Sequence, residues 1–550
     1  MERNGSQILV EALKSEGVDT IFGYPGGAVI PIFDALYDSG LRVILTRHEQ
    51  GAGHSADGYA RATGKVGVCI ATSGPGATNL TTALATANFD SSPVIAITGQ
   101  VKTALIGNDA FQEADITGIT RPVTKHNYLV KDVKELGQTL KNAFYIARSG
   151  RPGPVLIDLP VDVTTAKCVD PLPKDVRLSS YKPVIKGNMR QIRRAAEMIN
   201  AAERPVLYVG GGVIISGASQ EIRELAIRGN VPCTTTLMAL GTFDEKHSLS
   251  LGMLGMHGTA YANYAIMESD LIVAIGARFD DRITGDLTKF APKAKIVHID
   301  IDPTSISKNI RVDIPVVGDA KNIMAELLPL IEFAERSDWI QQIAEWKQKN
   351  PLKYANDGLK PQYVLEQIYE ASGGKAIITT EVGQNQMWAA QYFTYSEPRH
   401  FISSGGLGTM GFGLPAAIGA QFGCPDGLVV DVAGDGSIQM NIQELATAVF
   451  NKLPVNICIL NTGFLGMVRQ WQELFYEKRY SSTRLEGNPD FVKLAEAYGA
   501  RGMRITKPEQ VRPALDEACG TSVPVVRPLP IDYRESSKLT ERLGNIACPI

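Results

Sequence analysis

The sequence lacks the features that would point to an oxidising compartment or a membrane. Its 550 residues include seven cysteines, an odd number without any Cys-x-x-Cys pair. A disulfide framework or a zinc site of the usual spacing is therefore not expected. No run reaches the ~18 consecutive apolar residues that a membrane span requires, and the first residues contain no apolar signal-peptide segment. We expect a cytoplasmic protein that does not enter a membrane.

An excess of charge of either sign is also missing. The 55 Lys and Arg residues oppose 58 Asp and Glu residues, which gives a net charge of −3. Proteins that bind nucleic acid or an anionic membrane surface usually carry a clear basic excess, so neither partner is expected. The chain is too long for one core, and its length suggests about three domains of ~150–200 residues each.

Short apolar runs that end in Gly-rich turns alternate with helical patterns along the whole chain. Examples are the runs at 20–23, 94–99, 205–209 and 428–432. Strands that alternate with helices form parallel sheets with helices on both faces. The sequence therefore predicts an α/β fold of three doubly wound parallel-sheet domains, of which the first and third share one architecture.

Two stretches interrupt this alternation. Residues 166–187 are rich in Pro and Lys, and residues 336–358 begin with a charged surface helix, as is typical of interdomain linkers. The predicted domains are thus 1–165, 188–335 and 359–550. We expect a loop at 251–258. We also expect the last strand candidate, 525–532, to lie at a sheet edge, because its prolines cannot donate ladder hydrogen bonds.

The most informative stretch is the Gly-Asp-Gly-Ser sequence at 434–437, directly after an apolar run. A strand that ends in such a turn before a helix binds anions, and Asp435 can hold a divalent cation that neutralises a phosphate. A second strand ends at Thr462, and the spacing of 462 − 435 = 27 returns the chain to the same sheet edge. Alone, Gly-Asp-Gly is most often a plain turn. The two features together predict a site for a metal and a diphosphate.

Other strand ends carry weaker signals. Glu49 follows an apolar run, but on this segment alone an exposed helix-capping glutamate is the simpler interpretation. Three glycines at 210–212 are weak evidence for a dinucleotide, because the spaced G-x-G-x-x-G pattern is absent. Two arginines at 278 and 282 nevertheless suit a diphosphate.

Seven motifs in order along the chain carry a resemblance to a known family. They are RHEQ at 47–50, SGPGATN at 73–79, AFQE at 110–113, RPGPVLIDLP at 151–160, RFDDR at 278–282, GLGTMGFGLPAAIGA at 406–420 and GDGS at 434–437. From about residue 5 to residue 540, the chain resembles the catalytic large subunit of acetolactate synthase, also called acetohydroxyacid synthase, a thiamine-diphosphate enzyme. RFDDR together with Trp471 and its flanking glutamines favours this FAD-binding biosynthetic branch over pyruvate oxidase or glyoxylate carboligase.

The resemblance implies a reaction and its cofactors. The protein would decarboxylate pyruvate on thiamine diphosphate and transfer the hydroxyethyl unit to a second 2-ketoacid, pyruvate or 2-ketobutyrate, in branched-chain amino-acid biosynthesis. The implied cofactors are thiamine diphosphate, Mg²⁺ and FAD, the last without net redox. The implied assembly is a homodimer or tetramer with active sites between chains, and a small regulatory subunit is left open.

The resemblance also implies roles for residues. Glu49, Gln112 and Gly27 would be catalytic, with Glu49 the partner of the pyrimidine N1′. Asp435, Thr462 and Phe464 would hold Mg²⁺. Phe111, Arg282 and Trp471 would bind the second ketoacid, with Arg282 on its carboxylate. Thiamine diphosphate would contact Pro25, Pro75, Asn79, Val382, Gly383, Gln384, Asn385, Gly408, Met410, Gly434, Asp435, Gly436, Ser437 and Met467. FAD would contact Arg151, Gly211, Gly212, Thr236, Leu237, Met256, His257, Gly276, Arg278, Asp280, Asp300, Asp319 and Gln386.

Three residues depart from the family pattern. Thr462 stands where an Asn is usual, Asn385 where a diphosphate-contacting His is common, and Val161 where a Lys is frequent. Asn385 would be a shorter donor than the His. Two alternatives therefore stay open: another thiamine-diphosphate 2-ketoacid decarboxylase or pyruvate oxidase, and a low-activity homologue that acts as a partner subunit.

Overall fold

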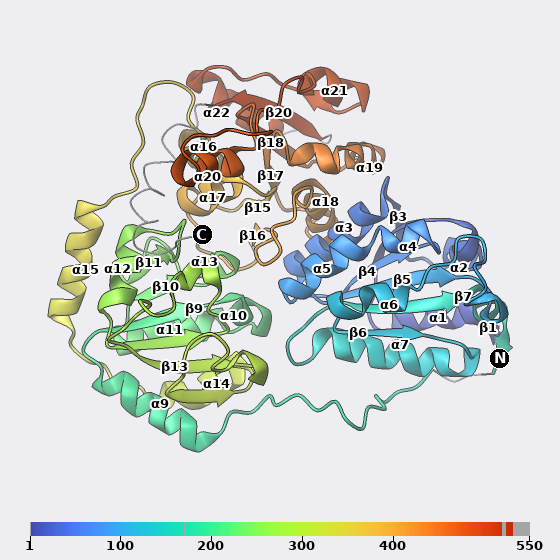
Figure 1. Cartoon of the computed structure of the whole chain (residues 1–550), viewed down its shortest axis with the longest axis horizontal. Coiled ribbons are helices and arrows are strands. Elements are labelled where there is room, and N and C mark those ends of the chain that lie inside the picture. The colour runs from blue at the N-terminus through green and yellow to red at the C-terminus, as the bar shows by residue number, and fades with distance from the viewer. Residues whose placement is uncertain (1, 170–171, 520–523, 532–550) are drawn as a thin grey trace.

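The computed structural model describes residues 2–169, 172–519 and 524–531. These residues form three six-stranded sheets, all of whose strand pairs are parallel. In Figure 1 the sheets lie in three separate bodies, with the first at the N-terminus, the second in green and the third in orange and red. The prediction of three doubly wound parallel-sheet domains is confirmed. Part of the first expected linker (170–171) and the end of the third expected domain (532–550) lie outside the described residues.

The first sheet has the strand order β3-β2-β4-β5-β7-β6. Its strands are β2 (Thr20–Tyr24), β3 (Arg42–Leu45), β4 (Gly67–Ala71), β5 (Val94–Gln100), β6 (His126–Leu129) and β7 (Val155–Pro160). The helices around it are α1 (Gly5–Ser15), α2 (Ile30–Tyr37), α3 (Glu49–Thr63), α4 (Pro75–Thr78), α5 (Thr81–Phe89), α6 (Ile116–Thr120), α7 (Val133–Arg148) and α8 (Val161–Thr165). The central strands β4, β5 and β7 are buried along their whole length because helices cover both faces.

The third sheet repeats this plan with the order β16-β15-β17-β18-β20-β19. Numbered from one in chain order, the strands of both sheets follow 2-1-3-4-6-5. The strands are β15 (Ile377–Thr380), β16 (Phe401–Ile402), β17 (Val429–Gly434), β18 (Asn456–Asn461), β19 (Arg501–Gly502) and β20 (Val525–Pro530). The helices are α16 (Pro361–Ser372), α17 (Gln384–Tyr392), α18 (Gly413–Gly423), α19 (Leu445–Phe450), α20 (Gly466–Phe475), α21 (Phe491–Ala497) and α22 (Val511–Cys519).

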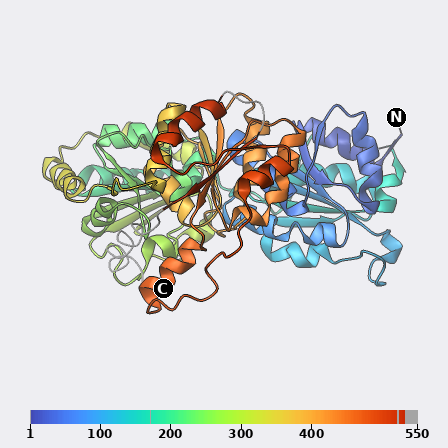
Figure 2. The same ribbon diagram turned by 90° about the horizontal axis from the view of Figure 1, so that it is seen from above.

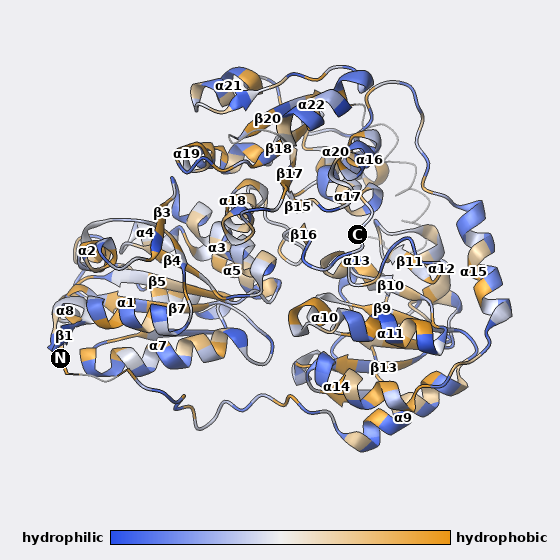
Figure 3. Cartoon of the chain, turned by 180° about the vertical axis from the view of Figure 1, so that it is seen from behind, coloured by the Kyte–Doolittle hydropathy of each residue, from blue (hydrophilic) through white to orange (hydrophobic). Residues whose placement is uncertain are grey.

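The middle sheet has a different order, β11-β10-β9-β12-β13-β14, which reverses direction between β9 and β12. Its strands are β9 (Pro205–Val209), β10 (Cys233–Thr235), β11 (Ser250–Met253), β12 (Leu271–Ile275), β13 (Lys295–Asp300) and β14 (Ile314–Val317). Its helices are α9 (Met189–Ala201), α10 (Gly211–Ser216), α11 (Ser219–Gly229), α12 (Ala260–Glu268), α13 (Asp281–Thr284), α14 (Ala320–Leu327) and α15 (Ser337–Lys349). Figure 3 shows apolar strands inside and amphipathic helices such as α9 outside, with one hydrophobic and one hydrophilic face each. This is expected where one face of a helix packs on a sheet.

Two helices dock the first domain on the third. Helices α3 and α18 lie side by side in Figures 1 and 2, and both consist largely of small residues. A Cβ atom on Gly58 would lie 2.3 Å from the Ala416 carbonyl oxygen, and one on Gly419 would lie 1.9 Å from the Ser55 carbonyl oxygen. The glycines are therefore required by the close approach of the two backbones.

Two expectations about strands are wrong. The loop expected at 251–258 begins as strand, because β11 pairs with β10 despite an irregular register and the positive φ of Gly252. Strand β20 lies inside its sheet, between β18 and β19, and not at the edge. The N–H and C=O of one residue point to the same side of a strand. The carbonyls of Pro524 and Pro528 accept hydrogen bonds from the segment of β19. The nitrogens of these prolines, which carry no hydrogen, therefore also point toward β19 and not toward the long strand β18.

Both segments expected to be linkers also contain regular structure that packs on the domains. Strand β8 (Lys167–Cys168) pairs antiparallel with β1 (Arg3–Asn4) at the start of the chain. Residues 172–188 then run without helix or strand to α9, below the domains in Figure 1. In α15, Trp339 is buried against the middle domain, so this charged helix has one apolar face. No helix among the described residues is both long and apolar enough to cross a membrane.

Candidate cofactor and active site

The carboxyl ends of β17 and β18 bring together the predicted metal ligands. The carboxylate of Asp435, which is 1% exposed, accepts four hydrogen bonds. Its Oδ1 accepts from the backbone N–H of Thr462 (3.2 Å) and from Thr462 Oγ1 (3.3 Å), and its Oδ2 accepts from Gly463 N–H (3.0 Å) and Asn488 Nδ2 (2.8 Å). Burial raises the pKa of Asp435, and these hydrogen bonds oppose the rise.

The donor set suits Mg²⁺, which prefers oxygen ligands. Thr462 Oγ1 lies 3.1 Å from the Phe464 carbonyl oxygen, so hydroxyl, carbonyl and carboxylate oxygens converge. They line a cavity of about 70 Å³ together with Gly434, Gly436 and Ser437. The described residues contain no cluster of three or more His, Cys, Asp and Glu that could hold a metal, so a metal here would need ligand or water oxygens as well.

Glu381, at the end of β15, holds the surroundings of this clamp. Its Oε2 accepts from Ser437 Oγ (2.7 Å) and from Gly411 N–H (2.7 Å), and Oε1 accepts from Leu414 N–H (3.2 Å). Burial raises the pKa of Glu381. Glu381 is not among the residues predicted from the sequence. Its position next to β17, at the carboxyl end of a neighbouring strand, is the signal that could have found it.

The side chain of Asn385 does not present a donor to the clamp. Both amide hydrogens are used within the fold, because Nδ2 donates to the carbonyls of Glu381 (2.9 Å) and Val432 (2.8 Å). The oxygen faces the glycines instead: Cβ atoms on Gly383 and Gly434 would lie 3.0 and 3.1 Å from Oδ1. The expectation of a shorter donor is therefore wrong for this conformation.

A second, larger cavity of about 950 Å³ lies between the three domains. Its floor is the reversal point of the middle sheet, where the turns after β9 and β12 meet, the position at which such sheets bind dinucleotides. A Cβ atom on Gly210 would lie 2.1 Å from the Gly276 carbonyl oxygen, so these turns require glycine. All residues that the resemblance assigns to FAD line this cavity: Arg151, Gly211, Gly212, Thr236, Leu237, Met256, His257, Gly276, Arg278, Asp280, Asp300, Asp319 and Gln386. The residues present fit such a group.

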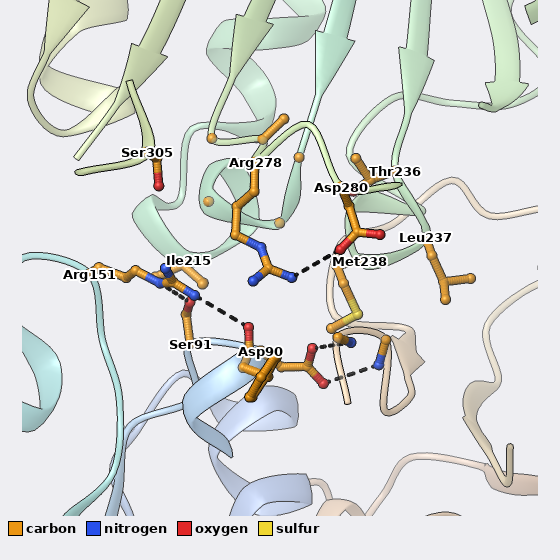
Figure 4. Close-up of a pocket in the computed structure, with 18 of the residues that line it drawn as sticks. Asp90, Ser91, Arg151, Ile215, Thr236, Leu237, Met238, Arg278, Asp280 and Ser305 are labelled. Atoms are coloured by element: carbon orange, nitrogen blue, oxygen red, sulfur yellow. Dashed lines mark hydrogen bonds and ion pairs between the residues drawn. The ribbon is translucent and has the colours of Figure 1, made fainter. Parts of the chain in front are cut away.

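The end of α5 forms one wall of the larger cavity (Figure 4). Arg151 donates through Nε to Ser91 Oγ (2.8 Å). The neighbouring Asp90 accepts from the backbone N–H groups of Gly405 (3.1 Å) and Gly406 (2.6 Å), and pairs with Arg61 at 3.0 Å. Asp90 therefore fixes the glycine-rich loop that continues to Gly408 and Met410. Its role was not anticipated from the sequence.

The two cavities meet at the predicted substrate residues. They share Val382, Gly383, Met410, Met467 and Val468 as lining residues. Beside this shared wall the guanidinium of Arg282 lies over the ring of Trp471, 5.4 Å from the centroid. Trp471 Nε1 is buried and has no hydrogen-bond partner in the described part of the chain. The guanidinium can bind the carboxylate of a ketoacid, and the aromatic ring beside it can contact the alkyl group of the same molecule.

The remaining predicted residues gather at the carboxyl edge of the first sheet and line neither cavity. Glu49 begins α3, and its Oε2 accepts from Asn79 Nδ2 (3.0 Å). Gln112 has a φ of +57°, and its carbonyl oxygen would lie 2.8 Å from a Cβ atom on Gly74. Phe111 is 87% exposed, and Pro25, Gly27, Pro75 and Asn79 are exposed as well. Val161 begins α8, away from both cavities.

Comparisons with known proteins identify the family of the chain. Three family models match, described as the N-terminal TPP binding domain (residues 3–119), the central domain (192–327) and the C-terminal TPP binding domain (381–527) of thiamine pyrophosphate enzymes. A probable acetolactate synthase large subunit of Methanocaldococcus jannaschii is 51% identical, over 99% of this chain and 95% of that protein. An acetolactate synthase of Mycobacterium bovis is 52% identical, over 94% and 85%, and the acetolactate synthase isozyme 3 large subunit of Escherichia coli K12 is 50% identical, over 94% and 92%. The resemblance carried by the seven motifs is confirmed, and the chain belongs to the acetolactate synthase large-subunit family of thiamine pyrophosphate enzymes.

Proposed function

We propose that the protein is an active acetolactate synthase, which decarboxylates pyruvate and transfers the hydroxyethyl unit to a second pyruvate or to 2-ketobutyrate. The observation that carries this proposal is the meeting of the two cavities, where Arg282 and Trp471 stand beside the clamp at Asp435. A ketoacid whose carboxylate pairs with Arg282 would have its carbonyl carbon close to the shared wall.

The chain contains residues that would bind each of the three cofactors. Asp435, Thr462 Oγ1 and the Phe464 carbonyl would hold Mg²⁺, and the glycines of the clamp would accept a diphosphate. Thiamine diphosphate supplies carbanion chemistry that side chains lack. FAD would lie in the larger cavity, where Arg151, Arg278 and the N-terminus of α10 offer donors to its diphosphate.

The first-sheet edge supports a homodimer with shared active sites. Glu49 would hold and move a proton at the pyrimidine N1′, yet in a single chain it lines neither cavity. Asn79, which donates to Glu49, is exposed, and so are Phe111 and Gly27 at the same edge of the sheet. We therefore place Glu49 of one chain opposite Asp435 of the partner subunit. A tetramer of two such dimers is compatible with this arrangement.

Incubation of the purified protein with pyruvate, thiamine diphosphate, Mg²⁺ and FAD tests the activity. Acetolactate is the expected product, and omission of thiamine diphosphate is the control. Acetaldehyde would instead identify a decarboxylase, and acetyl phosphate with peroxide a pyruvate oxidase. Absence of turnover with bound cofactors would favour the low-activity partner subunit.

Mixing two inactive variants tests the shared site. In a hybrid of Glu49→Gln and Asp435→Ala chains, one of the two sites combines an intact Glu49 with an intact Asp435. Random pairing makes half of the dimers hybrid, so activity should return to about a quarter of the wild-type value. If each chain carries a complete site, the mixture stays inactive.

Three further proposals concern the partner subunit, the location and the domain boundaries of the enzyme. The relatives are named large subunits, which supports association with a small subunit; a small subunit co-purified from the same source should shift the elution of the chain in gel filtration. We also keep a cytoplasmic location and the domain boundaries 165, 188, 335 and 359 as proposals, which cell fractionation and limited proteolysis would test.

A further inference from the structure

Glu444 is a buried carboxylate that reaches from the third domain into the first. It ends the short 3₁₀ helix η8 (Ile442–Glu444), nine residues after the clamp residue Asp435, and has no exposed surface. Its Oε1 accepts from the backbone N–H groups of Arg47 (3.0 Å) and His48 (2.9 Å), which belong to the turn after β3. Its Oε2 accepts from Thr447 Oγ1 (2.6 Å).

The two bonded N–H groups directly precede Glu49. They lie where β3 ends and α3 begins, so their position sets the direction in which Glu49 leaves the sheet. The carboxylate is packed so closely against the first turn of α3 that a Cβ atom on Gly51 would lie 2.4 Å from Oε1. Hydrogen bonds from backbone N–H to a buried carboxylate are strong, and their loss would leave the N–H groups of Arg47 and His48 without this partner.

A purely structural role in docking the domains is the competing interpretation. Docking, however, already rests on the long contact of α3 with α18 and on hydrogen bonds elsewhere between the two domains. Arg61 donates to the Ser403 carbonyl (2.6 Å), and Asp90 accepts from the N–H groups of Gly405 and Gly406. The bonds of Glu444 outside its own helix region reach only the turn at 47–48. Its contribution is therefore concentrated on the turn that carries Glu49.

We propose that Glu444 is a positioning residue for Glu49, and that the segment 435–447 consequently serves both active sites of a dimer. Asp435 holds the cofactor of one site, while Glu444 of the same chain orients Glu49 for the other. The second half of this inference rests on the shared active site proposed above. The first half does not depend on the ketoacids that the enzyme uses.

Proton exchange at C2 of bound thiamine diphosphate, measured without any ketoacid, tests the positioning role. Glu444→Ala should slow exchange by about 10- to 100-fold, because small displacements of a catalytic group are costly. Glu444→Gln keeps one acceptor oxygen for the turn and should recover part of the rate. The half-saturating concentrations of Mg²⁺ and thiamine diphosphate, read from protein fluorescence, should change less than about twofold, because Asp435 is untouched.

A double-mutant cycle with Glu49→Gln separates positioning from general damage. If Glu444 acts through Glu49, Glu444→Gln adds no further loss to the residual exchange of Glu49→Gln. A full additional loss, or a parallel loss of cofactor affinity, would overturn the proposal. Ser55→Ala, which removes the buried hydrogen bond from Ser55 Oγ to the Pro415 carbonyl (2.9 Å) between the same two domains, is the matched control and should leave exchange close to wild type. Because exchange needs no product, its outcome stands even if the protein does not make acetolactate.

Discussion

The first and third sheets share one strand order but differ at their carboxyl edges. The third strand in chain order ends in Ser-Gly-Pro-Gly at 73–76 in the first sheet and in Gly-Asp-Gly-Ser at 434–437 in the third. The position of Thr462 in the third sheet corresponds to Val101 in the first, as the registers of β5–β7 and β18–β20 show. At these two positions the third edge carries a carboxylate and a hydroxyl, Asp435 and Thr462, whereas the first edge has no carboxylate there. The shared fold places the turns, and a few side chains decide their chemistry.

The two edges also differ in what covers them. The third edge opens into two cavities closed by the middle domain and by α20, whereas Phe111, Pro25 and Gly27 leave the first edge exposed. Under the proposed function, one edge of each chain would bind cofactor and the other would offer Glu49 to a partner chain. Changes made at matching places in the two sheets should separate these two tasks.

The largest effect is expected at the two carboxylates. Glu49→Gln should lower turnover by about 10²- to 10⁴-fold, because a positioned proton-transfer group is lost, while Mg²⁺ and thiamine diphosphate still bind. Asp435→Asn should instead raise the half-saturating concentrations of both, and part of its activity should return with excess cofactor. Titration of activity against each cofactor makes the distinction. Recovery of Glu49→Gln by excess cofactor would mean that the two edges are not divided in this way.

The next largest effect, on stability, is expected at a buried position that β7 and β20 share. Ile157 pairs in register with Ile97, and Arg527 with Cys458, so the two residues occupy the same site of the shared plan. Arg527 is 1% exposed, donates to Asn456 Oδ1 (2.7 Å), and its Nε has no partner in the part of the chain that the structure describes. Ile157→Arg should destabilise the protein by about 3 kcal/mol or more, since it buries a charge without an anion.

The opposite substitution, which gives the third sheet the apolar residues of the first, tests the same difference between the two sheets. Asn456→Ile together with Arg527→Ile copies Ile95 and Ile157 of the first sheet and should raise the Tm, because an apolar pair replaces a buried cation. Thermal unfolding of the variants and of Ile157→Arg checks both directions. A fall in Tm for the double variant as large as that for Ile157→Arg would show that Arg527 is well paired in the folded protein.

The sequence predicted the sheets because their strands are buried on both faces and end in glycine turns, as in β4 and β17. It missed the two-residue β19, and with it the inner place of β20, because so short a strand leaves no pattern. Several predicted residues were visible in the sequence because they directly follow a strand, as Gly276, Asp435 and Thr462 do. Asp90, Glu381, Glu444 and Asn488 were missed, because their partners are 315, 56, 397 and 53 residues away and meet them only through the packing of the fold.

The raised pKa of Asp435 predicts how the third edge responds to acid. Only the carboxylate binds metal, so Mg²⁺ affinity should fall by up to about tenfold per pH unit once the pH drops below this pKa, starting at a higher pH than for an ordinary Asp. In the metal-free protein, a raised pKa means that protonated Asp435 contributes to the stability of the folded state. This contribution is fully present below the pKa of Asp in the unfolded chain, and it is lost as the pH rises through the raised pKa of the folded protein. Loss of affinity in acid therefore does not come from unfolding at this group. Mg²⁺ titrations across pH, with Tm recorded in parallel, test this.

The smallest effect is expected at Thr462. Its hydroxyl lies 3.3 Å from Asp435 Oδ1 and 3.1 Å from the Phe464 carbonyl oxygen, so it belongs to the oxygen cluster that would face the metal. An amide oxygen reaches further from the backbone than this hydroxyl, and magnesium tolerates little departure from octahedral geometry. Thr462→Asn should therefore lower the half-saturating concentrations of Mg²⁺ and thiamine diphosphate together, by about threefold to tenfold, because metal and diphosphate bind as one linked unit.

Two matched variants decide whether Thr462 acts as a ligand. Thr462→Ser keeps the hydroxyl and should leave both half-saturating concentrations unchanged, whereas Thr462→Val keeps the shape without the oxygen and should raise both. Thr462→Val also turns this position into the residue type that the first sheet carries at Val101, so it makes the third edge more like the first. Identical titration curves for all three variants would place Thr462 outside the metal shell, and the amide of Asn488, 2.8 Å from Asp435 Oδ2, would then be the next group to test.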